Sequence, residues 1–320
     1  MVYETFLRTI KSALEARFGS SYSVTLHRVA KNNNTFLDGL SVRKHSEALA
    51  PAVYLNIYYE SFLNGVSLDD ILNEIQSIYI NGAATPPLDP AQFQDFALAR
   101  DYIAYKLIHA ESNRELLADI PHKLFLDLAV VFYLYMKHDT FGQVTALVYH
   151  EHMETWGTNA GELYRIASLN TPRLLPAKIT NLHEVMKELI ANHPDHYRPE
   201  DLGELLDTDE KDPLFVLSNS SGIDGSCCML YPDRLRQFAG TYGCDVIILP
   251  SSIHEVLLMP NTTNISYREL GIMVTQINQT EVPREDQLSN QVYVYSLEED
   301  SIAIASQLAD IATDSPSPLS

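Results

Sequence analysis

The sequence has no long hydrophobic run and few cysteines. None of its apolar stretches reaches the roughly 18 residues that a membrane span needs, and its first residues lack a basic leader followed by an apolar core. We therefore expect neither a signal peptide nor membrane association. Of the three cysteines, Cys227 and Cys228 are adjacent and would close only a strained disulfide. The odd count would then leave Cys244 without a cysteine partner. This cysteine content predicts a reducing, cytoplasmic location.

Basic residues are also scarce, because 22 Lys and Arg stand against 42 Asp and Glu, for a formal net charge of −20. The excess of acid lies after residue 82, since residues 1–82 hold 7 basic and 8 acidic side chains. A net anionic chain repels phosphate backbones and anionic lipid, which disfavours nucleic acid and membranes as partners. It favours proteins with basic surfaces. The mildly basic residues 1–50 keep nucleic-acid binding open as an alternative.

The first 83 residues predict a small helix–hairpin–helix module. Apolar residues recur at helical spacing over 2–18 and the helix ends before Gly19. Residues 22–42 alternate as two strands around an asparagine-rich turn, and Asp38-Gly39 interrupts the second strand as a possible bulge. Ser67 with Asp70 forms a capping pair that predicts a further helix.

Three prolines within residues 84–90 forbid both helix continuation and strand pairing, which predicts a boundary. Beyond it, helices and strands are interspersed, and tight connections between strands favour antiparallel pairing. We predict an α+β fold in which a mixed, largely antiparallel sheet is flanked by helices, with a main domain at 91–297. Residues 298–320 are acidic and end in Ser and Pro, so we expect a mostly disordered tail.

Four stretches carry a resemblance to a known family. They are LDGLSV at 37–42, PHKLFLDLAVVFY at 121–133, WGTNAGELYRIASLNTPRLLP at 156–176 and ILPSSIHEVLLMP at 248–260. In order and spacing they resemble an uncharacterised bacterial family known as a domain of unknown function, number 5688 in that series, frequent in gut-dwelling Gram-positive anaerobes. The resemblance spans from about residue 1 to about residue 297. It implies no activity, ligand or catalytic residue.

The segment PSSIHEV holds the sharpest chemical candidates. Ser251, Ser252, His254 and Glu255 bring hydroxyl, imidazole and carboxylate together, the groups of a nucleophile, a base and an orienting acid. Catalytic triads assemble in space rather than along a strand, so a capping turn between two strands explains the same residues. A ligand-binding corner is the second interpretation, and covalent catalysis is the third.

Two further clusters are weaker. His150 and His152 would share one face of a strand predicted over 142–150 and could supply two nitrogen ligands to a metal, but further ligands would have to come from elsewhere. Cys227 and Cys228, in a strand predicted over 226–231, have no basic neighbour to activate a thiol. The glycines of NSSGIDG at 219–225 lack the lysine and spacing of a phosphate-binding loop and predict a turn.

The sequence therefore contains no complete catalytic motif, and we expect no cofactor and no resident metal. Its function is predicted to be that of a non-enzymatic interaction or regulatory protein with an acidic surface. The alternative is a hydrolase or small-ligand enzyme that uses the turn at residues 251–255, with a metal at His150 and His152.

Overall fold

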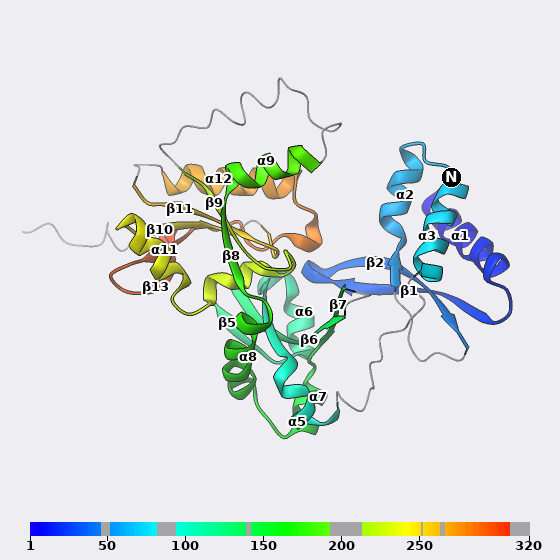
Figure 1. Cartoon of the computed structure of the whole chain (residues 1–320), viewed down its shortest axis with the longest axis horizontal. Coiled ribbons are helices and arrows are strands. Elements are labelled where there is room, and N and C mark those ends of the chain that lie inside the picture. The colour runs from blue at the N-terminus through cyan, green and yellow to red at the C-terminus, as the bar shows by residue number, and fades with distance from the viewer. Residues whose placement is uncertain are drawn as a thin grey trace, which may run out of the picture.

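The computed structural model of the chain describes residues 1–45, 52–81, 94–138, 142–192, 213–250, 252–262 and 266–307. It confirms the α+β fold, since helices accompany three sheets whose strands pair in antiparallel fashion (Figure 1). The proline-rich segment at 84–90 and residues 308–320 lie outside the described residues. Within the described ranges, no helix is long and apolar enough to cross a membrane.

The N-terminal part packs three helices on a sheet of order β1-β2-β3. Its elements are α1 Tyr3–Phe18, β1 Tyr22–Lys31, the 3-10 turn η1 Asn32–Asn34, β2 Thr35–Lys44, β3 Ala52–Tyr54, α2 Leu55–Leu63 and α3 Leu68–Asn81. Phe6, Ile10 and Leu14 lie on one face of α1 at helical spacing and are fully buried against this sheet and the other helices. Ser67 accepts a hydrogen bond from the Asp70 N–H, which is the predicted cap of α3.

The bulge expected at Asp38-Gly39 is wrong. The β1–β2 register is continuous, with Asp38 opposite Arg28 and Gly39 opposite His27. A Cβ at Gly39 would lie 2.9 Å from His27 Nε2, so the glycine makes room for the cross-strand histidine ring.

The second sheet pairs β6 with β4 on one side and with β5 and β7 on the other. This part of the chain comprises α5 Phe96–Ala99, η2 Arg100–Tyr102, β4 Ile103–His109, η3 Glu111–Asn113, α6 Arg114–Asp119, β5 His122–Phe125, β6 Leu128–His138, β7 Gly142–Leu147, α7 His150–Trp156 and α8 Ala160–Leu174. Strand alternation turns Tyr105 and Leu107 toward the main core, whereas Lys106 and Ile108 face the opposite side.

The third sheet has the order β13-β12-β10-β11-β9-β8. Its part of the chain comprises β8 Ala177–Asn181, α9 Leu182–Asn192, β9 Phe215–Asn219, η5 Gly225–Leu230, α11 Arg234–Tyr242, β10 Val246–Leu249, β11 Val256–Pro260, α12 Tyr267–Thr280, η6 Arg284–Asp286, β12 Tyr293–Ser296 and β13 Ser301–Ile304. Leu270 and Val274 of α12 pack on one face of this sheet. Because β13 pairs with β12, residues 301–304 of the segment expected to be a tail form an edge strand.

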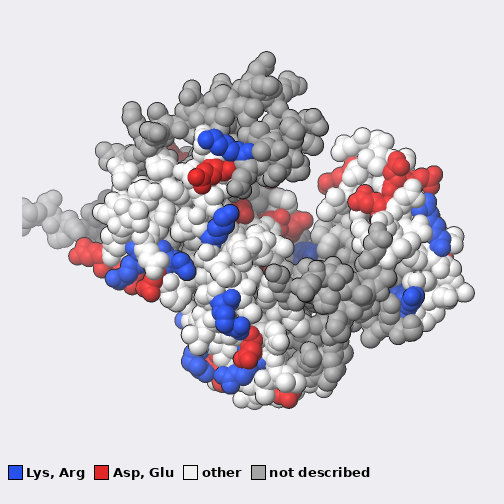
Figure 2. All heavy atoms as spheres, viewed as in Figure 1, with Lys and Arg blue, Asp and Glu red and all other residues white. Residues whose placement is uncertain are grey.

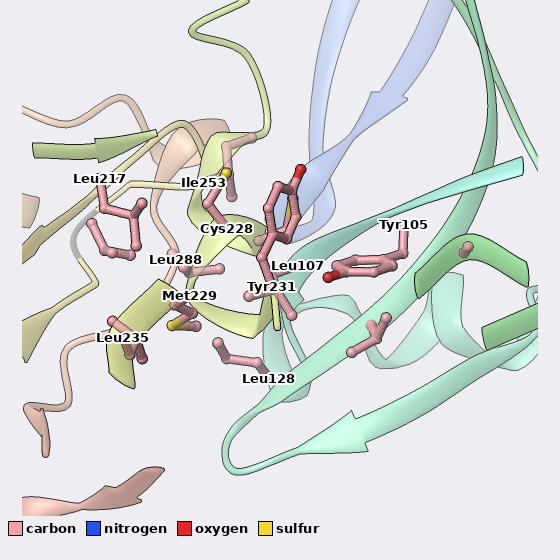
Figure 3. Packing of buried hydrophobic residues seen from close by; sticks show 14 of the residues in the cluster. Tyr105, Leu107, Leu128, Leu217, Cys228, Met229, Tyr231, Leu235, Ile253 and Leu288 are labelled. Carbon is pink, nitrogen blue, oxygen red and sulfur yellow. The ribbon is translucent and has the colours of Figure 1, made fainter. Parts of the chain in front are cut away.

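The main core lies between the second and third sheets. Figure 3 shows Cys228 and Met229 of η5 packed among side chains that include Leu107 and Leu128 of the second sheet. The strand predicted over 226–231 is therefore wrong, because Gly225–Leu230 forms a 3-10 helix. An apolar run this short has no periodicity that distinguishes a strand from a buried helical turn.

The tip of the β1–β2 hairpin attaches the N-terminal part to the rest of the chain. Asn33 is 5% exposed and has a left-handed backbone, with φ 57°. Its Nδ2 donates to the carbonyls of Arg284 at 2.8 Å and Gln287 at 2.7 Å. Its N–H donates to Asn113 Oδ1 at 2.8 Å, and its Oδ1 accepts from Asn113 Nδ2 at 3.0 Å. The polar side-chain atoms of Asn33 are thus all paired, and they hold the tip in place.

We expect Asn33→Ala to lower the free energy of unfolding by about 2–4 kcal/mol, because it removes the donor to the part-buried Arg284 and Gln287 carbonyls and the acceptor of one Asn113 Nδ2 hydrogen bond. Urea denaturation followed by circular dichroism measures this change. Asn34→Ala is the matched control, since Asn34 is adjacent, shares the positive φ at 53° and is exposed. Equal losses in the two variants would contradict the role assigned to Asn33.

Candidate functional site

A cleft of about 640 Å³ lies where the hairpin tip meets the second sheet. Its roof is formed by residues 30–36 of the hairpin, and its floor is the side of β4, β6 and β7 that faces away from the main core. Residues 111–119, which include α6, form one wall. The roof and the floor of this cleft therefore come from segments far apart in the sequence. The hydrogen bonds of Asn33 hold these segments together.

The floor is apolar apart from Lys106, Tyr133 and Thr145. Ile108, Val131 and Leu147 line it, and Lys106 and Tyr133 stand among them. Lys106 Nζ lies 5.8 Å from the centroid of the Tyr133 ring. Burial raises the pKa of Tyr133 well above its usual value, so its hydroxyl stays a neutral donor.

Lys106 forms an ion pair with Asp224, in the loop that follows β9. Its Nζ lies 3.2 Å from Asp224 Oδ2, and the two side chains are 27% and 12% exposed. Asp224 has φ 53°, a backbone that orients its carboxylate toward β4. The predicted turn at 219–225 thus supplies the carboxylate that holds the Lys106 ammonium in place. Sequence reasoning missed Lys106, although it is the one lysine in a strand whose other residues, apart from His109, are buried.

The turn at 219–225 and the PSSIHE segment meet at Gly225. A Cβ on this residue would lie 2.2 Å from Ser218 Oγ and 2.5 Å from the His254 carbonyl. Only glycine fits so close an approach. The Ser226 N–H then donates to the Ile253 carbonyl at 3.1 Å, which holds the two segments together.

His254 is the centre of this corner. Its Nδ1 accepts from the Asp224 N–H at 3.2 Å, and its Nε2 lies 3.2 Å from Asp286 Oδ1. The hydrogen bond with Asp286 raises the pKa of His254, while partial burial opposes that rise. Both ring nitrogens therefore have partners within the protein. One is the Asp224 N–H, just before η5, and the other is the Asp286 carboxylate, at the end of η6.

The other candidates of this turn have separate places. Ser251 lies outside the described residues. Ser252 is 5% exposed, and its Oγ accepts from the His254 N–H at 2.9 Å rather than facing the imidazole ring. Glu255 is half-buried at the end of the turn, before β11. Among the described residues, the arrangement is that of a turn closed by a serine hydroxyl.

His150 and His152 do not share a strand face, so that expectation is wrong. β7 ends at Leu147 and His150 begins α7. The Nδ1 of His152 accepts from the Tyr149 N–H at 3.0 Å, and its ring stacks on Trp156 with centroids 5.8 Å apart. His152 therefore caps the helix. Within the described ranges, no three His, Cys, Asp or Glu side chains come together in a way that could hold a metal.

The adjacent cysteines lie inside the main core. Cys227 and Cys228 are both fully buried. The hydrogen bond with Cys228, followed by burial, raises the pKa of the Cys227 thiol well above its usual range. A raised pKa removes the thiolate that a nucleophilic Cys227 would need. Because both side chains are fully buried, the pair packs as small apolar groups.

Comparison with known proteins identifies one family. No curated protein and no solved structure is significantly similar to the chain. The model of a family of unknown function, DUF5688, matches residues 3–297, which span the hairpin, the cleft and all but the last strand of the third sheet. The chain belongs to this family of unknown function.

Proposed function

We propose that this chain is a non-enzymatic interaction or regulatory protein whose ligand lies in the cleft between the β1–β2 hairpin and the second sheet. The observation that carries this proposal is the construction of the cleft from two separately packed parts of the chain. The roof belongs to the N-terminal part and the floor to the second sheet. A ligand in this cleft would contact both parts at once.

The lining supports binding of a ligand with both apolar and polar groups. Phe36 in the roof and Tyr149 at the end of the floor are each 42% exposed. Large aromatic side chains that stay exposed at a concave surface are typical anchors of bound molecules. A volume of about 640 Å³ lies within the range of ligand-binding pockets.

The His254 corner supports a structural role in this proposal. Its ring joins the Asp224 and Asp286 segments, and Asp224 in turn holds Lys106 at the cleft. The hydrolase alternative would need the imidazole to reach a serine hydroxyl, and the Ser252 hydroxyl accepts from a main-chain N–H instead. No observation favours that alternative.

The net charge of −20 supports proteins with basic surfaces as partners. Acidic side chains gather on the N-terminal helices in Figure 2. Exposed acidic residues there are Glu60 of α2 and Asp69, Asp70 and Glu74 of α3. We place such a partner second to the cleft ligand, because charge alone gives weak and salt-sensitive association.

We expect Leu147→Trp, which fills the cleft from its floor, to abolish retention of a ligand. The full-length protein is incubated with a small-molecule extract of cells and desalted, and the retained compounds are identified by mass spectrometry. A compound retained by the unmodified chain should be lost in Leu147→Trp. The matched control is Leu124→Trp, because Leu124 is 64% exposed on β5 and lies away from the cleft lining. The proposal fails if no compound is retained, or if both variants retain it equally.

The stability contributed by His254 should fall as the pH rises. Asp286 raises the pKa of His254 in the folded chain. The stability that this interaction contributes is therefore fully present below the pKa of the unfolded chain, near 6.5, and is lost as the pH rises through the pKa of the folded chain. The difference in unfolding free energy between the unmodified chain and His254→Gln should therefore shrink as the pH rises above about 6.5.

Urea denaturation at a series of pH values measures this difference. In an Asp286→Asn background, the difference should depend less on pH, because the carboxylate that raises the pKa of His254 is gone. Asp224, Glu255 and Asp286 are the carboxylates that act on the ring. A difference that grows with pH would contradict the assignment, because it would mean that the Asp224 N–H bond to Nδ1 keeps the ring neutral.

A further inference from the structure

We propose that the cleft binds a short peptide with free termini, an inference that rests on the ligand-binding function proposed above. The ligand class follows from the cleft's apolar floor, from the placement of its charged side chains and from its uncharged polar edges.

The floor is suited to aliphatic side chains. Ile108, Val131 and Leu147 come from three neighbouring strands, and Leu116 of α6 lines the same space. A ligand that covers this floor removes apolar surface from water, which is the main source of affinity in such a site. The exposed ring of Phe36 in the roof would cover the other side of an aliphatic chain.

The charges at the cleft are separated by sign. The wall at residues 111–119 carries Glu111, Glu115 and Asp119, and its Arg114 is already paired with Glu111. The hairpin instead carries Lys31, whose ammonium lies 4.0 Å from the centroid of the Tyr54 ring and has no carboxylate partner among the described ion pairs. Lys106 on β4 adds an ammonium that is already paired with Asp224. A ligand with one ammonium and one carboxylate complements both sides, whereas a purely anionic ligand would meet the carboxylates of the wall.

The uncharged polar groups match the amides of a peptide. Asn34, Ser112 and Thr145 line the cleft with exposed side chains that can donate or accept. Asn32 Oδ1, at the edge of the roof, is buried and has no hydrogen-bond partner among the described residues. An unpaired acceptor of this kind is costly, and a ligand N–H that reached it would remove that cost.

Isothermal titration calorimetry with the full chain and the peptide Leu-Leu-Leu tests the proposal. We expect one-site binding with a Kd of about 1 mM or tighter. The same peptide with an acetylated amino end and an amidated carboxyl end should bind about tenfold more weakly, because it lacks both charges. Equal binding of the two peptides would overturn the charge argument.

The acidic wall is tested by the double variant Glu115→Gln with Asp119→Asn. It should weaken Leu-Leu-Leu about threefold or more and leave the acetylated, carboxyl-free form unchanged, since that form has no ammonium. Glu4→Gln with Glu74→Gln on the N-terminal helices is the control and should change neither. If Leu-Leu-Leu fails to bind at about 5 mM, the peptide class is wrong. Retention of another compound that Leu147→Trp abolishes would then leave the cleft function standing, and loss of both would reject both.

Discussion

The hydrogen bonds of Asn33 connect the hairpin tip to two other segments of the chain. A left-handed backbone at this position lets the side chain point into the protein, and asparagine tolerates that backbone better than most residues do. Its amide then pairs with Asn113 of η3 and with two carbonyls at η6. Asn32 adds a bond from its Nδ2 to the Glu285 carbonyl at 2.9 Å. The tip is therefore bound through polar groups, which are main-chain carbonyls and the Asn113 side chain.

Both segments that hold Asn33 continue into the candidate site. Asn113 lies at the start of the acidic wall of the cleft. On the other side, Asp286 belongs to η6 and contacts His254, which engages Asp224 and through it Lys106. The roof, the wall and the charged residue of the floor are thus linked by one series of polar contacts. A change at the tip would reach the cleft through groups that have discrete hydrogen-bonding arrangements.

Local patterns in the sequence predicted what local forces determine. The helical spacing of Phe6, Ile10 and Leu14, the asparagine turn at 32–34 and the Ser67 cap were all read from neighbouring residues. The 3-10 helix at Cys227 and Cys228 was missed, because a close approach at Gly225 and the surrounding core determine it. For the site, the turn containing Ser252 and His254 was predicted, but its partners Asp224 and Asp286 are distant in sequence and only the fold brings them together.

The same contacts connect the turn that contains His254 to the cleft. Asp224 neutralises Lys106, and the ring of His254 is shared between a main-chain N–H and Asp286, so the corner offers few free groups of its own. What it presents to the cleft is one lysine ammonium, held in a fixed position. Within the described residues, the hairpin tip supplies the hydrogen bonds that hold the roof, so a ligand in the proposed cleft site would add to the docking free energy of Asn33. In the function proposed above, binding in the cleft and attachment of the N-terminal helices are thermodynamically linked, because both depend on the hydrogen bonds of Asn33.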